Sequence, residues 1–183
     1  MLNKAVNSKP SINRLVIIGL GLIGSSLAVA ARELGLAETV VGISRRSSTL
    51  ELALDRGIID QACDSLKAIA NDLDAGDMVV IGVPTLTVPG ILKECHELLS
   101  DCVTITDVAS VKGSVVNAAT NIYGRMPGQF VPGHPIAGSE RSGVTAADSK
   151  LFEHHKVILT PTETTESKHL EAVASLWIWL LYT

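Results

Sequence analysis

The sequence predicts an α/β fold in which helices cover both faces of a mostly parallel β-sheet. Short runs of Val, Ile and Leu alternate along the chain with longer amphipathic segments, which is the pattern of βαβ units. Hydrophobic residues make up 46% of the chain but aromatic residues only 3%, so the core must be aliphatic, as it is in buried parallel sheets. The 183 residues suffice for one domain with a sizeable core, and no linker long enough to divide them is visible.

Strands and helices are expected to alternate from the N-terminus to the C-terminus. The expected strands are Leu15–Ile18, Thr39–Ile43, Met78–Val83, Val103–Thr106, Phe130–Val131 and Val157–Leu159. The expected helices are Leu22–Leu34, Thr49–Asp55, Leu66–Ala70, Val88–Leu99, Val111–Ile122 and Glu166–Leu180. Residues 1–13 are expected to form a polar N-terminal tail, which leaves residues 14–183 for the α/β domain.

Local signals support several of these boundaries. Gly35 follows the first helical pattern, where glycine commonly ends a helix. Ser48 and Glu51 have the spacing of a capping box, which predicts that the second helix opens beside them. Pro84 lacks a backbone N–H group and is expected to end the strand before it.

The first strand runs directly into a glycine-rich loop, Gly19-Leu20-Gly21-Leu22-Ile23-Gly24, that opens the first helix. In this context the GxGxxG pattern is the fingerprint of Rossmann-type, doubly wound folds that bind dinucleotides. Gly19 permits the tight turn, Gly21 lets the pyrophosphate approach the backbone, and Gly24 allows close packing of helix on strand. The free N–H groups of the helix would face the phosphates. A glycine-rich turn without a ligand is the structural alternative.

The end of the second strand indicates which dinucleotide binds. NAD-binding domains usually place Asp or Glu there, about 20 residues after the glycine loop, to bind the ribose 2′-hydroxyl. Here the segment reads Ser44-Arg45-Arg46, and the first acid is Glu51, inside the next helix. A hydroxyl and two guanidinium groups suit a 2′-phosphate, which a carboxylate would repel. NADP is therefore preferred to NAD, and two solvated arginines are the alternative.

Three more strand ends carry residues suited to ligands, because the carboxyl ends of parallel strands line the binding crevice. Val83, Pro84 and Thr85 are expected to contact the nicotinamide or its ribose. The other two ends are residues 106–112, which include Asp107, Ser110 and Lys112, and residues 132–143, which include His134, Glu140 and Arg141.

We expect Ser110, Lys112 and His134 to converge on the nicotinamide. Structural alternatives remain for each end: Asp107 and Ser110 could cap a helix, and His134 could be a turn residue with a satisfied hydrogen bond. Glu140 and Arg141 could form a surface ion pair.

Composition limits the other partners. The net charge of −4 gives no reason to expect nucleic acid or an anionic membrane as a partner. The segment Leu15–Ala31 is apolar, but its glycines and serines favour a buried strand and helix over a membrane span. Cys63, Cys95 and Cys102 lack metal-site spacing, so no metal is expected, and free, mostly buried thiols in a reducing cytoplasm are the favoured interpretation.

Three motifs, taken in order, resemble the prephenate/arogenate dehydrogenase family. They are Val-Ile-Gly-Leu-Gly-Leu-Ile-Gly-Ser-Ser, Asp-Val-Ala-Ser-Val-Lys and Gly-His-Pro-Ile-Ala-Gly-Ser-Glu-Arg-Ser-Gly. The third is the most diagnostic, and the resemblance extends over residues 12–175. The Ser-Arg pair after the second strand is similar to the family members that use NADP.

The resemblance implies an activity and roles for individual residues. Members of the family oxidatively decarboxylate prephenate or arogenate in tyrosine biosynthesis, with hydride transfer to the nicotinamide. By similarity, His134 would accept the proton of the ring hydroxyl, a duty suited to a side chain that changes charge near neutral pH. Ser110 would bind the same hydroxyl or orient His134 and the nicotinamide, and Glu140 would gate or orient the site.

The chain also departs from the family. Members carry a second, helical domain that forms a homodimer and binds the substrate carboxylate, whereas this sequence stops at Thr183. A truncated dehydrogenase that binds nucleotide but lacks full turnover is therefore expected, with a weakened dimer. Two alternatives remain: a β-hydroxyacid or ketopantoate-type dehydrogenase, and a non-catalytic NADP-binding module that pairs with a partner through its C-terminal aromatic residues.

Overall fold

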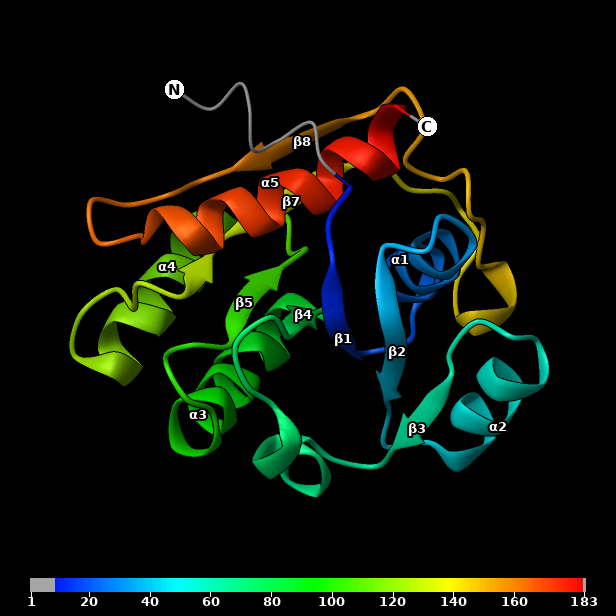
Figure 1. Ribbon diagram of the computed structural model, residues 1–183, viewed down its shortest axis with the longest axis horizontal. Coiled ribbons are helices and arrows are strands. Elements are labelled where there is room, and N and C mark those ends of the chain that lie inside the picture. The colour runs from blue at the N-terminus through cyan, green and yellow to red at the C-terminus, as the bar shows by residue number, and fades with distance from the viewer. Residues whose placement is uncertain (1–8, 183) are drawn as a thin grey trace.

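The computed structural model describes residues 9–182, which form a parallel six-stranded sheet with helices on both faces (Figure 1). The strand order is β3-β2-β1-β4-β5-β6, and every neighbouring pair is parallel. This order confirms the predicted Rossmann-type doubly wound fold. The strands are β1 (Ile12–Ile18), β2 (Ala37–Ile43), β3 (Gln61–Cys63), β4 (Met78–Ile81), β5 (Thr104–Asp107) and β6 (Phe130–Val131).

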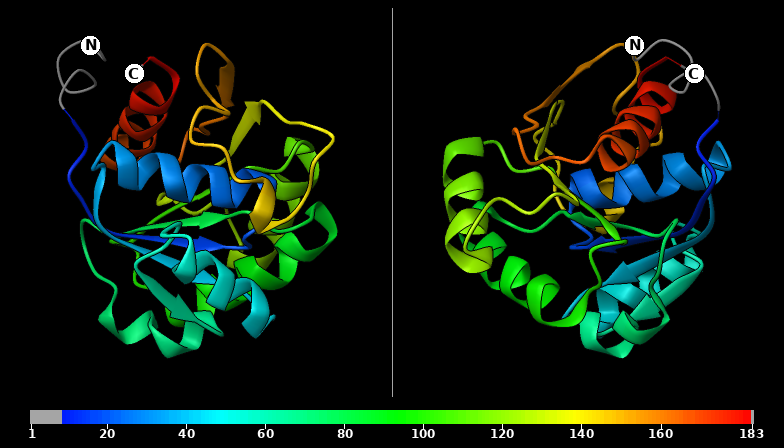
Figure 2. Two further views of the ribbon diagram at one scale, coloured as in Figure 1. Left: turned by 90° about the vertical axis from the view of Figure 1, so that its right-hand side faces the viewer. Right: turned by 60° about the vertical axis from the view of Figure 1, so that its left-hand side comes forward.

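Two layers of helices bury the sheet. The α-helices are α1 (Leu22–Glu33), α2 (Ser47–Asp55), α3 (Val88–Leu98), α4 (Lys112–Tyr123) and α5 (Ser167–Tyr182). Helices α1 and α5 lie on one side of the sheet, and α3 and α4 lie on the other (Figure 2). Because successive strand residues point to opposite faces, Leu15 and Ile17 of β1 pack with the first layer while Val16 and Ile18 pack with the second.

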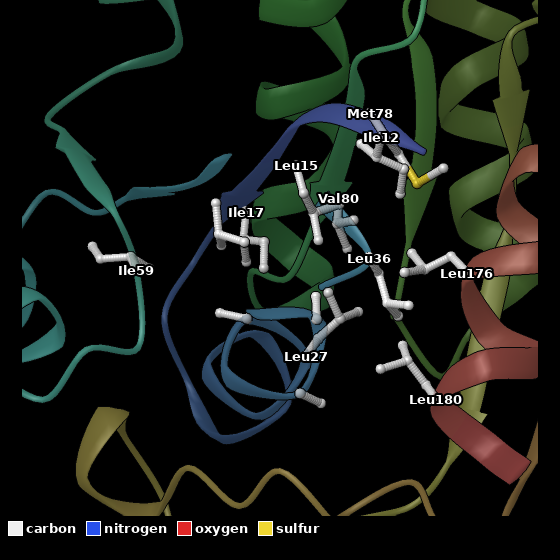
Figure 3. Close-up of a cluster of buried hydrophobic side chains, with 14 of the residues drawn as sticks. Ile12, Leu15, Ile17, Leu27, Leu36, Ile59, Met78, Val80, Leu176 and Leu180 are labelled. Carbon is white, nitrogen blue, oxygen red and sulfur yellow. The ribbon is translucent and has the colours of Figure 1, made fainter. Parts of the chain in front are cut away.

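The aliphatic core follows from this arrangement. Figure 3 shows Leu15 and Ile17 of β1 facing Leu27 of α1, with Leu176 and Leu180 of α5 beside them. All five side chains are buried, as expected for strands covered on both faces.

The last predicted strand does not belong to the main sheet. Val157–Leu159 lies in β8 (Lys156–Leu159), which pairs antiparallel with β7 (Gly133–Ile136) in a separate two-stranded sheet. Exposed and half-buried residues alternate along β8, so this apolar run never belonged to the core of the main sheet. The sixth strand of the main sheet is instead the short β3, which was not predicted because half-buried Ala62 and Cys63 give too weak a signal.

The same finding corrects the predicted position of His134. We expected His134 to follow a strand of the main sheet, but it lies inside β7 and pairs with Ile158 of β8. The chain leaves the main sheet at Pro132, directly after β6, and starts the second sheet one residue later.

Several helix boundaries also differ from the prediction. The capping box is wrong: α2 begins at Ser47, its N-cap is Arg46, and no side chain caps it. The segment Leu66–Ala70 is not one helix but lies in two short 3-10 turns, η1 (Leu66–Ala68) and η2 (Ala70–Asp72). The prediction rested on the spacing of the apolar residues. Two short turns bury Leu66, Ile69 and Ala70 as well as a continuous helix would.

Of the two residues expected to end an element, one does so and the other does not. Gly35 follows α1 in the left-handed conformation, with φ +60°, and its N–H group donates to Arg32 O, which confirms the predicted stop. Pro84 does not end its strand directly, because β4 already ends at Ile81; the Gly82 N–H group makes the last backbone hydrogen bond to β1, to Ile18 O over 2.8 Å.

The two ends of the described chain pack on the fold. β1 begins at Ile12, which pairs with Ala37, so the last residues of the predicted tail belong to the sheet, while residues 1–8 lie outside the described part. At the other end, Trp177 is buried and stacks edge-on against Phe152, with ring centroids 5.3 Å apart. Of the C-terminal aromatic residues, Tyr182 is exposed. Within residues 9–182, no helix has both the length and the apolar character needed to cross a membrane.

Candidate dinucleotide and catalytic sites

A cavity of about 580 Å³ opens at the carboxyl ends of the first four strands. Loops after β1, β2, β3 and β4 supply most of its lining, which is where doubly wound folds bind ligands. Its walls include Ile18, Gly19, Leu20, Gly21, Ile43, Ser44, Arg45, Arg46, Thr49, Asp64, Ser65, Leu66, Gly82, Val83, Pro84, Thr87, Ile91, Glu94, Gly143 and Val144.

The turn after β1 is built around two tightly packed glycines. Gly19 has φ +102°, and a Cβ atom there would lie 2.7 Å from Gly82 O in the loop after β4. At Gly24 a Cβ atom would lie 2.1 Å from Gly19 O, so only glycine lets α1 start so close to the turn. The roles that the sequence predicts for these two glycines agree with this geometry.

Gly21 differs, because nothing in the chain lies near its missing side chain. A Cβ atom at this position would meet no heavy atom within 4 Å. Gly21 is the N-cap of α1, no side chain caps the helix, and no acidic residue stands in its first turn. The N–H groups and positive dipole end of α1 are thus free for an anion. This open cradle fits a dinucleotide pyrophosphate. Leu20 and Gly21 line the cavity, whereas Leu22, Ile23 and Gly24 stand behind it in the helix.

The end of β2 presents hydroxyl and guanidinium groups to the cavity. Ser44, Arg45 and Arg46 all line it, and the Arg46 N–H group donates to Ser44 Oγ over 3.2 Å. Both arginines are exposed, and among the described residues neither guanidinium has an ion-pair partner. The side chains are therefore available to a charged ligand.

The loop after β3 adds lining that the sequence did not reveal. Asp64 and Ser65 follow β3, and the Ser65 hydroxyl donates to Asp64 Oδ1 over 2.8 Å. Their role was missed because β3 itself was not predicted. Gly143 and Val144 reach the same cavity from the end of the loop after β7 and the start of the 3-10 turn that follows it, a contact between distant segments that no local pattern signals.

The loop after β4 only partly matches the prediction. Val83 and Pro84 line the cavity, as expected of cofactor-binding residues. Thr85 begins the 3-10 turn η3 (Thr85–Thr87) and is not part of the lining, while Thr87 and Ile91 are. Because the chain turns here, Thr87 reaches the cavity in place of Thr85.

The predicted catalytic residues lie outside the cavity walls: Ser110 follows β5, His134 lies in β7, and Glu140 lies in the loop after β7. The Asp107 carboxylate is fully buried and forms an ion pair with Lys112 Nζ. It also accepts hydrogen bonds from the N–H groups of Ala109 (2.9 Å) and Gly133 (3.1 Å). Ser110 and His134 each follow one of these donors, so the structure brings their two segments together around one carboxylate.

The structure rules out one of the structural alternatives for this region. Asp107 and Ser110 do not cap α4, whose N-cap is Val111 without any side-chain hydrogen bond.

Burial shifts the pKa values of both members of the ion pair toward their neutral forms. It raises the pKa of the Asp107 carboxyl, an effect that the Lys112 ammonium opposes, and it lowers the pKa of Lys112.

Ser110 is exposed and His134 half-buried, so both can meet a ligand. Glu140 and Arg141 lie exposed in the loop between β7 and the 3-10 turn η4 (Val144–Ala146). Among the described residues they form no ion pair with each other, and the Arg141 N–H group donates to Ser139 Oγ over 3.2 Å.

Two further expectations concern cysteines and metals. Cys63, Cys95 and Cys102 are free thiols, and burial raises the pKa of Cys95 to about 12. Such a thiol is inert at neutral pH. Within residues 9–182, no cluster of three or more His, Cys, Asp or Glu side chains could hold a metal ion.

Comparison with known proteins decides the family. The model of the prephenate dehydrogenase nucleotide-binding domain matches residues 27–180. The chain belongs to the prephenate dehydrogenase family. A prephenate dehydrogenase of Lactococcus lactis is 35% identical over 150 residues, which is 81% of this chain and 41% of the relative.

Solved structures agree with this family assignment. Prephenate dehydrogenase from A. aeolicus, in complex with hydroxyphenyl propionate and NAD+, superposes with a TM-score of 0.85 at 36% identity, over 96% of this chain and 60% of that one. Synechocystis arogenate dehydrogenase gives a TM-score of 0.82 at 32% identity, over 93% of this chain and 58% of that one. The chain spans 41% and 43% of the length of the two curated prephenate dehydrogenases, from Lactococcus lactis and Bacillus subtilis.

Proposed function

We propose that this chain is the NADP-binding part of an enzyme that oxidatively decarboxylates prephenate or arogenate in tyrosine biosynthesis. The cavity beside the GxGxxG turn carries the proposal, since it fits a dinucleotide and the chain belongs to the prephenate dehydrogenase family. The relatives bear names of both kinds, prephenate dehydrogenase and arogenate dehydrogenase. The three free thiols accord with a cytoplasmic enzyme. From the resemblance to the family, we also propose that the protein forms a homodimer.

The preference for NADP rests on the end of β2. The A. aeolicus relative was solved with NAD+. In this chain, Ser44, Arg45 and Arg46 border the cavity at the place where an NAD-binding domain usually has a carboxylate. Guanidinium groups bind phosphate through charge-assisted, often bidentate hydrogen bonds. These residues would hold the 2′-phosphate of NADP.

The residues around Asp107 would carry the chemistry. The bound nicotinamide supplies a hydride acceptor. His134 would accept the proton of the ring hydroxyl as the hydride leaves the carbon that bears it. The ring carboxylate departs as carbon dioxide, its bonding electrons complete the aromatic ring, and the resulting phenolate oxygen takes the proton back from His134. Ser110 would donate a hydrogen bond to the same hydroxyl or orient His134, and Glu140 would orient the mouth of the site.

Calorimetric titration with NADP+ and NAD+ tests the cofactor. We expect NADP+ to bind more tightly, and the double variant Arg45→Ala/Arg46→Ala to lose at least tenfold in affinity, which is about 1.4 kcal/mol. Arg125→Ala, an exposed arginine that does not line the cavity, should bind like the parent chain. Equal or tighter binding of NAD+ would discard the phosphate-binding role.

Assays of the same variants with prephenate and with arogenate then test the reaction. His134→Ala should retain NADP+ affinity but lose turnover. A chain that binds NADP+ yet reduces none with either substrate would instead be a non-catalytic nucleotide-binding module on its own.

A further inference from the structure

The buried ion pair of Asp107 and Lys112 joins the two segments that carry the proposed catalytic residues. Asp107 is 0% exposed and Lys112 only 14%. Neither residue lines the dinucleotide cavity. The pair stands where the end of β5, the start of α4 and the start of β7 meet.

Together the pair holds both backbone groups of one residue, Gly133. The Gly133 N–H group donates to Asp107 Oδ1 over 3.1 Å, and Lys112 Nζ donates to Gly133 O over 2.6 Å. A Cβ atom on Gly133 would lie 2.9 Å from Asp107 O, so the close approach of β7 to β5 depends on glycine here. His134 is the next residue, so this clamp, formed by Asp107 and Lys112 on Gly133, holds its backbone together with the pairing of β7 and β8.

The same carboxylate fixes the other segment. Asp107 Oδ2 accepts from the Ala109 N–H group over 2.9 Å, and Ser110 follows directly. One side chain thus joins the turn before Ser110 to the first residue of the strand that carries His134.

The position of Lys112 is costly for the helix that contains it. Lys112 is the first residue of α4, whose N-cap has no side-chain hydrogen bond. A cation at this end opposes the helix dipole, and a buried ion pair is often no more stable than apolar side chains of similar volume. Residues that are unfavourable for local stability in this way are commonly found at functional sites.

We propose that Asp107 and Lys112 are positioning residues that hold Ser110 and His134 at a fixed separation, so that both meet the ring hydroxyl of one substrate. The proposal rests on the proposed function, because it assigns the clamp to the same reaction. Catalytic groups must be held close to their productive geometry by such supporting contacts.

The test uses Lys112→Met and the double variant Asp107→Asn/Lys112→Met, which leaves no unpaired buried charge and so keeps the test available if the single variant fails to fold. Lys93→Met is the matched control, because it removes an exposed lysine that is paired with Glu97 on α3. Four quantities are measured: NADP+ affinity by calorimetry, kcat and the KM for NADP+ with prephenate or arogenate as substrate, and the ring resonances of His134 by NMR, assigned by their loss in His134→Ala.

We expect both Lys112 variants to bind NADP+ within twofold of the parent chain, to lose at least 30-fold in kcat with little change in the KM for NADP+, and to show shifted His134 resonances. Lys93→Met should change none of these. Unchanged kcat and unchanged His134 resonances in a folded Lys112 variant would overturn the proposal. So would a parallel loss of NADP+ affinity, which would indicate a general structural role.

Failure of the proposed function is recognised separately. If the parent chain binds NADP+ but turns over neither substrate, the catalytic assignment fails for this chain, and the His134 resonances alone then decide whether the clamp positions that ring.

Discussion

At the scale of single residues, the three glycines of the first turn differ in what surrounds them. A side chain on Gly24 would collide with the carbonyl of Gly19, whereas one on Gly21 would enter open space. Gly24 is therefore required by the fold, whereas Gly21 leaves room for a ligand. The GxGxxG spacing predicts both positions, but only the surrounding atoms show which of the two the fold itself requires.

This difference separates folding from binding. Gly24→Ala should lower the free energy of unfolding by about 1–3 kcal/mol, the usual cost of overpacking. Gly21→Ala should change it by less than about 1 kcal/mol, because the new methyl group meets no protein atom. Urea unfolding measures both values, and calorimetry should show at least tenfold weaker NADP+ binding for Gly21→Ala. A Gly21 variant that binds NADP+ normally would argue against a pyrophosphate at this turn.

At the scale of elements, the packing of α5 accounts for its aromatic residues. Trp177 is buried against Phe152, and Leu176 and Leu180 pack in the same core. An interface through the C-terminal aromatics therefore cannot use Trp177. Its indole N–H group is buried without a hydrogen-bond partner in the described part of the chain, so its contribution is apolar.

Substitutions at this position should follow that contribution. Trp177→Ala should cost about 3–5 kcal/mol of unfolding free energy, the range for large aromatic core residues. Trp177→Phe should cost clearly less, since the ring contact with Phe152 persists and no hydrogen bond is lost. Tyr182→Ala is the control at an exposed site on the same helix, with a change expected within about 0.5 kcal/mol. Urea unfolding followed by circular dichroism measures all three, and a Phe variant as unstable as the Ala variant would contradict this account.

At the scale of the whole molecule, His169 ties the last helix to the central sheet. It lies buried on α5, and its Nδ1 is 2.7 Å from the hydroxyl of Thr104 on β5. Burial, together with the nearby Lys168 ammonium, lowers the pKa of His169, against the weaker effect of Glu166. The folded state therefore favours the neutral imidazole.

The stability of the chain should consequently depend on pH. The folded-state pKa of His169 lies below its unfolded value of about 6.5, so the stability is fully present above that pH and is lost as the pH falls below it. The loss is limited to about 1.4 kcal/mol per pH unit, because one proton is involved. Urea unfolding at pH 7 and pH 5 should show a smaller drop for His169→Asn than for the parent chain. His155→Asn, on the surface, should follow the parent chain, and equal drops in all three would refute the assignment.

The sequence by itself determined the fold class, most of the core strands and the glycine turn, because these depend on local patterns: buried aliphatic runs, helical periodicity and GxGxxG spacing. It also indicated the segments of Ser110 and His134 and the residues after β2. Tertiary structure alone decided the rest. Two antiparallel strands pair outside the main sheet, with His134 inside one of them. Gly143 reaches the cavity from a distant loop, and Asp107 with Lys112 clamps Gly133. Such contacts join residues far apart in the chain, and their energies depend on neighbours that no local pattern contains.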